Sequence, residues 1–594
     1  MGNGFQRLKK LRMLFFEWDR NLDTYEYGVD ELNYKWESDD FLVLCDCCLS
    51  KNVNVEVILS RIPQRNRVDY LENYLPGGFF VLIFDKKDRK VNLFRDSSGV
   101  KTVYYNIHQK SFLLGTNVHK VYKRCNEKTG FNSLSIDMLF NLEFLYDGYT
   151  IYDSVSELVL GSEFTLMKSD LQPTISERKM NFAKQDNDLS LKQNIQKLRE
   201  VTNKVHKNLS SEENVVFLSG GLDSCVMLAA LHDTVGKDKI HNISFKVKGT
   251  EHDETVYAKS VSDHLGTSLE IIEVDPEDEI SVEKFEEIVL KMNNPYIGYW
   301  IFNFEGNPKQ KFFAGQDTRL HTPDVNKFDS FVFSTILSGL PMPLGKTSHK
   351  LGKALHSALN LDKSNKKALK HLHRIFGSLS KEEYIENYLF RLEKSRFEDL
   401  PNENYEAIKE ILAVDYKGIK NKRQMYNEIV KIKWKEQYTD DIRYIQDMSW
   451  LNNTYTCLPF YDMEMSEFSS SIPFKYASLF IKGTDRFSSE EVNVNKYVLR
   501  EAYSDVLNEE VLYRKKAVSM TNFLLFQGGL GRVVKKVVEQ DLASKESFIK
   551  SQGIENFVTP MVKNDKWQLD DQTYLLTVYY IATMCIYHKN IVLS

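Results

Sequence analysis

The chain has 594 residues, which is too long for a single hydrophobic core and predicts two or more domains. A hydrophobic content of 42%, a charged content of 27% and a formal net charge of -5 are ordinary for a globular protein and give no global argument for nucleic-acid binding. No signal peptide or membrane-spanning apolar run is visible, so we expect a cytoplasmic protein without a membrane partner.

The seven cysteines are odd in number and scattered, which argues against a disulfide framework. Cys45, Cys47 and Cys48 lie in an apolar run and lack a matching His or Cys pair. We interpret them as buried strand thiols in preference to a metal site.

Residues 1–185 are predicted to be rich in β-strands. Short apolar runs separated by turn residues predict strands at 41–45, 53–59, 78–84, 90–95, 103–105 and 112–116. Residues 189–209 then have a polar, helical pattern.

The segment Val215–Leu228 predicts a buried strand, a tight turn and the start of a helix. Gly220 and Gly221 let the backbone bend sharply, and the first helical turn directs N–H groups at whatever fills the bend, a place that suits phosphate. Ser219 and Ser224 add hydroxyl donors, and Asp223 supplies a carboxylate where a magnesium ion would bridge phosphates. An ordinary strand-turn-helix corner is the alternative.

Further strands at 243–247 and 269–274, with a helix at 252–267 that Gly266 ends, follow this segment. Strand, helix and strand in this order predict a parallel, doubly wound sheet, whose ligands sit at the carboxyl ends of the strands. An apolar helix is expected at 574–587.

These motifs resemble the asparagine synthetase family. The six residues 219–224 read SGGLDS and resemble the pyrophosphate loop of the N-type ATP pyrophosphatases, whereas 78–116 and 152–161 resemble a class II glutamine amidotransferase domain. The resemblance implies an N-terminal αββα sandwich of the Ntn-hydrolase type at 1–185. It implies an adenine nucleotide α-hydrolase-like α/β domain at 186–594, with a helical insertion at 328–440.

The resemblance breaks at the glutaminase centre. That class needs a processed N-terminal cysteine as nucleophile, but position 2 is Gly and the first cysteine is Cys45. No Asn-Gly-Glu tripeptide is found either. We therefore expect an inactive amidotransferase-like domain.

The resemblance implies ATP and Mg²⁺ as cofactors. It assigns nucleotide binding to Leu218, Ser219, Gly220, Gly221, Asp223, Ser224, Val247, Ala314, Gly315 and Arg319, and metal binding to Asp223 and Asp317.

Three positions of the implied site depart from the family pattern: Gln316, Arg319 and, in a later segment, Tyr455. Gln316 stands where the family has Glu or, in β-lactam synthetases, a catalytic Tyr, and Arg319 stands at a metal-binding Asp. Asp317 could replace that carboxylate, Arg319 could bind pyrophosphate as a bidentate fork, or the turn could contact no ligand.

Two candidate catalytic residues come from the C-terminal half. Tyr455 stands where lactam-forming relatives have a catalytic Glu, and it either handles protons or only packs. Lys516, with Lys515 beside it, matches the lysine that stabilises the acyl-adenylate transition state, unless this is a solvated cluster.

The implied function is ATP-dependent amide formation, in which a substrate carboxylate is adenylated and then attacked by an amine, as in β-lactam synthetases and lasso-peptide macrolactam cyclases. An ammonia-dependent asparagine synthetase and a non-catalytic nucleotide-binding scaffold are the alternatives. The substrate would be a small molecule or peptide carrying a carboxylate and an amine. Other candidate partners are a precursor peptide or carrier, and a second copy of the chain in a homodimer.

The basic segment 346–374 is either a solvated helical face or a site for an acidic partner.

Overall fold

The computed structural model describes residues 14–29, 33–47, 55–65, 71, 75, 77–109, 111–146, 148–177, 185–250, 253–315, 399–412, 442–482, 491–513, 521–564 and 571–594. All statements below concern these residues. No helix among them is both long enough and apolar enough to cross a lipid bilayer.

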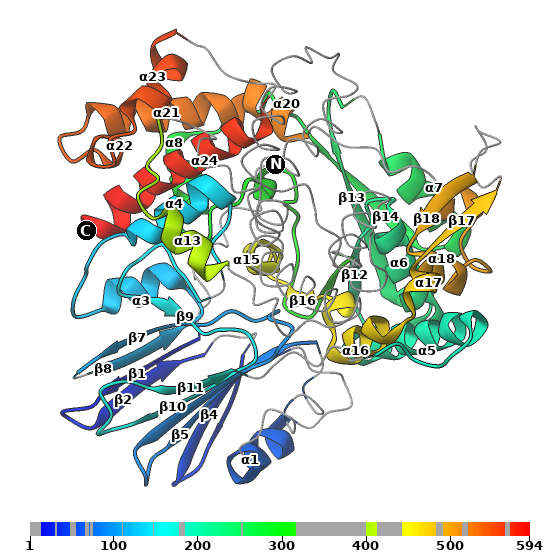
Figure 1. The fold of residues 1–594 in the computed structure, drawn as a ribbon, viewed down its shortest axis with the longest axis horizontal. Coiled ribbons are helices and arrows are strands. Elements are labelled where there is room, and N and C mark those ends of the chain that lie inside the picture. The colour runs from blue at the N-terminus through cyan, green and yellow to red at the C-terminus, as the bar shows by residue number, and fades with distance from the viewer. Residues whose placement is uncertain are drawn as a thin grey trace, which may run out of the picture.

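The N-terminal part is a sandwich of two antiparallel sheets, seen at the lower left of Figure 1. The first sheet has the order β2 (Thr24–Gly28), β1 (Phe15–Asp19), β8 (Ser111–Gly115), β7 (Tyr104–His108), β9 (Ser156–Glu157). The second has the order β11 (Thr174–Glu177), β10 (Ser162–Met167), β6 (Lys90–Arg95), β5 (Phe79–Asp85), β4 (Phe41–Cys47), β3 (Tyr34–Glu37).

The sandwich follows from the alternation of side chains along its strands. Phe16 and Trp18 on β1 and Leu82 and Phe84 on β5 point into one buried core between the sheets. Helix α1 (Val55–Arg65) covers the outer face of the second sheet, and α3 (Val118–Arg124) and α4 (Ser133–Leu142) cover the first. This arrangement confirms the predicted αββα fold.

One predicted strand is wrong. The stretch 53–59 was expected to be extended because apolar and polar residues alternate over its first five positions. The structure instead begins α1 at Val55, because Ile58, Leu59 and Ile62 recur at helical spacing and bury their side chains against the sheet. Alternation over five residues is too short to distinguish the two periods.

The C-terminal part contains the predicted parallel sheet, with the order β14 (Ser268–Val274), β13 (Ile240–Val247), β12 (Asn214–Phe217), β15 (Lys311–Ala314), β16 (Tyr455–Cys457). One face packs on helices that include α5 (Leu191–Leu209), α6 (Leu222–Val235), α7 (Thr255–Leu265), α16 (Met463–Ser471) and α18 (Tyr497–Ala502). The other face packs on α15 (Arg443–Leu451) and on Val100 and Leu160 of the N-terminal part. The sheet therefore has both faces covered, as parallel sheets require.

A further group of helices forms a layer that bridges the two parts, at the upper left of Figure 1. This layer comprises α8 (Val282–Val289), α20 (Thr521–Gln527), α21 (Gly529–Ala543), α22 (Phe548–Ser551), α23 (Glu555–Asn564) and the predicted apolar helix α24 (Gln572–Tyr587). The other described elements are α13 (Tyr405–Ile411), α17 (Phe474–Ala477), α19 (Glu509–Tyr513) and the hairpin of β17 (Ser478–Lys482) and β18 (Glu491–Asn495).

Candidate functional site

The turn between β12 and α6 has the geometry of a phosphate-binding loop. It leaves the carboxyl end of β12, next to the end of β15. Gly220 has a φ of +72°, which lies in the left-handed region that favours glycine. Helix α6 begins after Gly221, an N-cap residue that has no side chain to cap the first N–H groups. Those groups and the helix dipole are therefore directed at the space above the turn.

Close packing explains why glycines occupy this place. A Cβ at Gly220 would lie 2.7 Å from the carbonyl oxygen of Glu254, at the start of α7. A Cβ at Gly315, which follows β15, would lie 3.0 Å from the backbone nitrogen of Ser224. Backbone segments from β12, β15 and α7 thus converge at the carboxyl edge of the sheet.

The two serines hold the shape of the loop. The backbone N–H of Ser219 donates to Ser224 Oγ at 3.2 Å, and Ser224 Oγ donates to the carbonyl oxygen of Gly221 at 3.0 Å. The two hydroxyl oxygens are 3.1 Å apart. Hydrogen bonds within the loop therefore pre-organise it before any ligand arrives.

Lys496 reaches this loop from a distant part of the chain. Its Nζ lies 2.9 Å from Oδ1 and 2.8 Å from Oδ2 of Asp223, and the two side chains are 13% and 25% exposed. Lys496 precedes α18 and has a φ of +52°, an unusual backbone conformation for a lysine. Lys496 begins the segment 496–501, which resembles the family's Lys-x-x-Leu-Arg-Glu helix. That resemblance assigns Lys496 no role and does not indicate a contact with a carboxylate 273 residues away.

The structure places the other predicted residues as follows. Val247 and Ala314 end β13 and β15 and are 3% exposed, and Leu218 is fully buried just before the loop. Gly315 lies against the loop, as described above. Gln316, Asp317, Arg319, Lys515 and Lys516 lie outside the described residues, as do Cys48 and the basic segment 346–374.

Tyr455 is not brought to the loop. It begins β16 and pairs with Lys311, the first residue of β15, so it lies at the amino edge of the sheet. Three residues of a strand, about 10 Å, separate that level from the carboxyl edge. Its ring has Lys311 Nζ at 4.2 Å and Lys101 Nζ at 5.9 Å from the centroid. This environment favours the packing alternative over direct proton transfer at the phosphates.

The described residues do not fit a metal ion bound by the protein. Magnesium prefers six oxygen ligands in near-octahedral geometry. No group of three His, Cys, Asp or Glu side chains among the described residues could hold a metal ion, and Lys496 occupies both oxygens of Asp223. Asp317, the second expected ligand, lies outside the described part.

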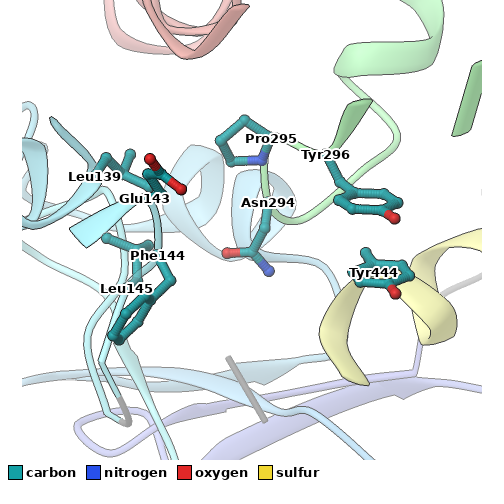
Figure 2. Close-up of a pocket in the computed structure, with 8 residues that line it drawn as sticks. All are labelled: Leu139, Glu143, Phe144, Leu145, Asn294, Pro295, Tyr296 and Tyr444. Carbon is teal, nitrogen blue, oxygen red and sulfur yellow. The ribbon is translucent and has the colours of Figure 1, made fainter. Parts of the chain in front are cut away.

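A second feature is a small pocket between α4 of the N-terminal part and α15 (Figure 2). Its cavity volume is about 20 Å³, which is room for about one water molecule. The rings of Tyr296 and Tyr444 stack on one side with centroids 3.5 Å apart, and the end of α4 lies opposite. The pocket is lined by Leu139, Glu143, Phe144, Leu145, Asn294, Pro295, Tyr296 and Tyr444.

The pocket and the loop are linked through one aromatic cluster. Tyr296 precedes a segment in which Phe302 packs 4.9 Å from Phe217, the last residue of β12. Tyr444 is in the first turn of α15, which runs back along the sheet to the amino edge, where β16 begins. The pocket therefore lies on the sheet face that meets the N-terminal part, toward the loop end of the strands.

Comparisons with known proteins agree with this arrangement. The asparagine synthase family matches residues 198–302 and 313–585, and the glutamine amidotransferase domain family matches residues 48–176. A provisionally named glutamine-hydrolysing asparagine synthetase 2 of Methanocaldococcus jannaschii is 28% identical over 196 residues. That stretch covers 32% of this chain and 38% of the archaeal protein, so the chain matches well under two thirds of that relative.

Two solved structures were also found. An NH3-dependent NAD synthetase from Campylobacter jejuni is 12% identical and covers 31% of this chain and 94% of its own, with a TM-score of 0.17. A glutamine-dependent NAD+ synthetase from Acinetobacter baumannii, in complex with ADP, is 12% identical. The match covers 45% of this chain and 61% of that protein, with a TM-score of 0.17. Scores this low carry no argument. The asparagine synthase family matches more than half of the sequence, and the chain therefore belongs to the asparagine synthase family.

Proposed function

We propose that the protein is an ATP-dependent, AMP-forming carbon–nitrogen ligase that adenylates a substrate carboxylate and couples it to an amine. One observation carries the proposal: the SGGLDS loop at the carboxyl edge of the parallel sheet, with Gly315 packed against it and Lys496 on its carboxylate. A triphosphate seated there would receive backbone N–H donors from α6 and a cation from the side.

The reaction would have two balanced steps. A carboxylate oxygen of the substrate attacks the α-phosphorus of ATP, and the bond to the bridging oxygen breaks, which releases pyrophosphate. The amine then attacks the acyl carbon and loses a proton to solvent, and AMP leaves as the amide forms. The loop would bind the β- and γ-phosphates, and Lys496 would lie close to the charge that develops on the leaving pyrophosphate.

The pocket of Figure 2 is our candidate for the amine group at the acceptor end of the substrate, because its cavity of about 20 Å³ has room for one group the size of a water molecule. Its walls are mainly apolar and aromatic, and Glu143 and Asn294 supply a carboxylate and an amide. The Nδ2 atom of Asn294 is buried and has no hydrogen-bond partner among the described residues. This lining suits an amine on an apolar body better than it suits a dicarboxylate such as aspartate.

We further propose that the amine belongs to the substrate itself, so that the product is a lactam or another intramolecular amide. The support is that all six described cysteines are buried, which leaves none of them placed to release ammonia from glutamine. A small molecule, or a peptide presented by a precursor or carrier, would then be the partner. The N-terminal domain would serve as a wall of the acceptor pocket through α4.

An ammonia-dependent asparagine synthetase is a second candidate. The archaeal relative is named a glutamine-hydrolysing asparagine synthetase, so its match supports the asparagine product but not free ammonia as the nitrogen source. The two candidates differ in the carboxylate that triggers pyrophosphate release. We expect no release above background with aspartate and ammonia at saturating ATP, and release with peptides that carry both an acidic side chain and a free amine. Release with aspartate plus ammonia would support the asparagine synthetase, and tight ATP binding without release on any carboxylate would point to a scaffold.

A further inference from the structure

The Asp223 carboxylate, which was expected to bind magnesium, is paired with the ammonium group of Lys496. Both oxygens of Asp223 lie within 2.9 Å of Lys496 Nζ, so one ammonium spans the two positions through which a metal would bind. The pair is largely shielded from solvent, with the lysine side chain 13% exposed. Shielding of this kind keeps an ion pair strong in salt, unlike the exposed pairs elsewhere on the surface.

The helix that follows Lys496 fixes it in this position. Val498, Leu499 and Ala502 of α18 are buried in the core that α5 and α6 share. Lys496 itself is held with a φ of +52° at the start of that helix. This conformation is unfavourable for a lysine, and the burial of α18 and the pair with Asp223 offset its cost.

Few of the described groups around Asp223 could serve as ligands for a metal. Ser224 Oγ donates to the carbonyl oxygen of Gly221 and accepts from the N–H of Ser219, so its hydroxyl is engaged inside the loop. The described residues contain no cluster of three acidic, His or Cys side chains that could complete a coordination shell. The donors that remain are N–H groups, which bind anions and repel cations.

We propose that Lys496 is the resident cation of the phosphate site and takes the place of a metal ion bound to Asp223. This inference rests on the proposed function, since it assumes that ATP binds at this loop. Asp223 alone would repel the β- and γ-phosphates. The ammonium neutralises it, and the same ammonium can donate to phosphate oxygens when they arrive. Magnesium would then enter with the nucleotide and need no carboxylate from this loop.

Nucleotide binding to the full-length protein tests the inference. The dissociation constant of ATP is measured by calorimetry in excess Mg²⁺ and in excess EDTA for the wild type, Lys496→Gln, Lys496→Arg and Lys204→Gln. Lys204 is a matched control because it also pairs with a carboxylate of another element, Glu464, but on an exposed surface. Thermal unfolding of each variant reports on folding.

We expect the wild type to bind ATP in EDTA within about tenfold of its affinity in Mg²⁺. Lys496→Gln should weaken binding by about 10- to 100-fold in both buffers, the range for one charged hydrogen-bond partner, with Lys496→Arg in between and Lys204→Gln unchanged. Titration of the free enzyme with Mn²⁺, followed by electron paramagnetic resonance, should detect no site that Asp223→Asn removes.

Two results would overturn the inference and leave the proposed function intact: ATP binding that needs a divalent ion and is unaffected by Lys496→Gln, or a stoichiometric Mn²⁺ site in the free enzyme that Asp223→Asn abolishes. An absence of ATP binding by the wild type in both buffers would instead reject the proposed function itself.

Discussion

Two charged residues occupy left-handed backbone positions at the places where the structure brings its parts together. Lys496 has a φ of +52° beside the phosphate loop, and Glu143 has a φ of +69° at the end of α4, in the wall of the pocket. Such positions cost a non-glycine residue roughly 1–2 kcal/mol. Asp23 and Arg89 have the same conformation in hairpin turns, so it is the contacts of Lys496 and Glu143 that support the two sites.

The first prediction concerns Gly220. Replacing it with alanine should reduce ATP affinity at least about tenfold, because the new Cβ would lie 2.7 Å from the Glu254 carbonyl oxygen and would push the loop away from α7. Gly249→Ala is the matched control: Gly249 also has a positive φ, +85°, but nothing lies within 4 Å of its Cβ position. Equal ATP affinities in the two variants would show that strain alone, and not the loop geometry, explains any change.

At the scale of elements, α15 joins the two parts of the molecule. Arg443 Nη2 bonds Glu157 of β9, which also receives Arg95 Nη1 at 2.9 Å, and all three side chains are at most 2% exposed. One turn later, Asp447 accepts hydrogen bonds from the backbone N–H and Nδ2 of Asn293, each at 2.8 Å. The helix therefore carries a buried polar network that only the assembled domains satisfy.

The second prediction follows from this network. Glu157→Gln should lower the free energy of unfolding by about 3–5 kcal/mol, because it removes the carboxylate charge that the two buried guanidinium groups of Arg95 and Arg443 share. Glu464→Gln breaks an exposed pair with Lys204 and should cost less than about 1 kcal/mol. Chemical denaturation followed by tryptophan fluorescence measures both, and a cost for Glu157→Gln as small as the control's would contradict the network.

The third prediction concerns pH. Burial raises the pKa of the Asp447 carboxyl from 3.8 to about 7, while nearby hydrogen bonds and Arg443 act in the opposite direction. Between these two values the folded protein keeps a proton that the unfolded chain has lost, so this group makes stability fall as pH rises from about 4 to about 7. Asp447→Asn removes the pH-dependent contribution of this carboxyl to the free energy of unfolding. The stability of the variant relative to wild type should rise by at least about 1 kcal/mol between pH 5 and pH 8, and parallel curves would refute this.

The sequence predicted the elements whose signals are local. The strand before the loop, the two glycines and the apolar helix after them are contiguous, and all appear in β12 and α6. The prediction for stretch 53–59 failed because alternation over five residues does not exclude the start of α1. Tyr455 shows another limit, since its motif gave the segment but not the register with Lys311 that places it at the amino edge. The Lys496–Asp223 contact joins residues 273 apart in the chain and depends on an unusual φ. The resemblance of 496–501 to a family helix could therefore place the lysine but not its partner.

At the scale of the whole molecule, the N-terminal part supplies more than a second lobe. Val100 and Leu160 pack on the face of the parallel sheet that α15 leaves open, and α4 provides one side of the pocket. The synthetase sheet thus depends on the sandwich for burial. A domain without glutaminase chemistry would still be retained for this reason, because its loss would expose an apolar sheet face to water.

The last prediction is that this retained domain does not supply nitrogen from glutamine. Glutaminases of the amidotransferase type need an accessible thiolate, but the six described cysteines are buried, and burial raises the pKa of the Cys45 and Cys585 thiols and brings that of Cys125 to about 11. Incubation with glutamine should therefore yield no glutamate above that of a heat-inactivated sample, with or without ATP.

Iodoacetamide applied to the native protein should leave pyrophosphate release unchanged. Cys48, the seventh cysteine, lies outside the described residues, so Cys48→Ala should behave as wild type in both assays. Glutamate formation that iodoacetamide or Cys48→Ala abolishes would assign the domain a working thiol and would make free ammonia, in place of a substrate amine, the expected nucleophile.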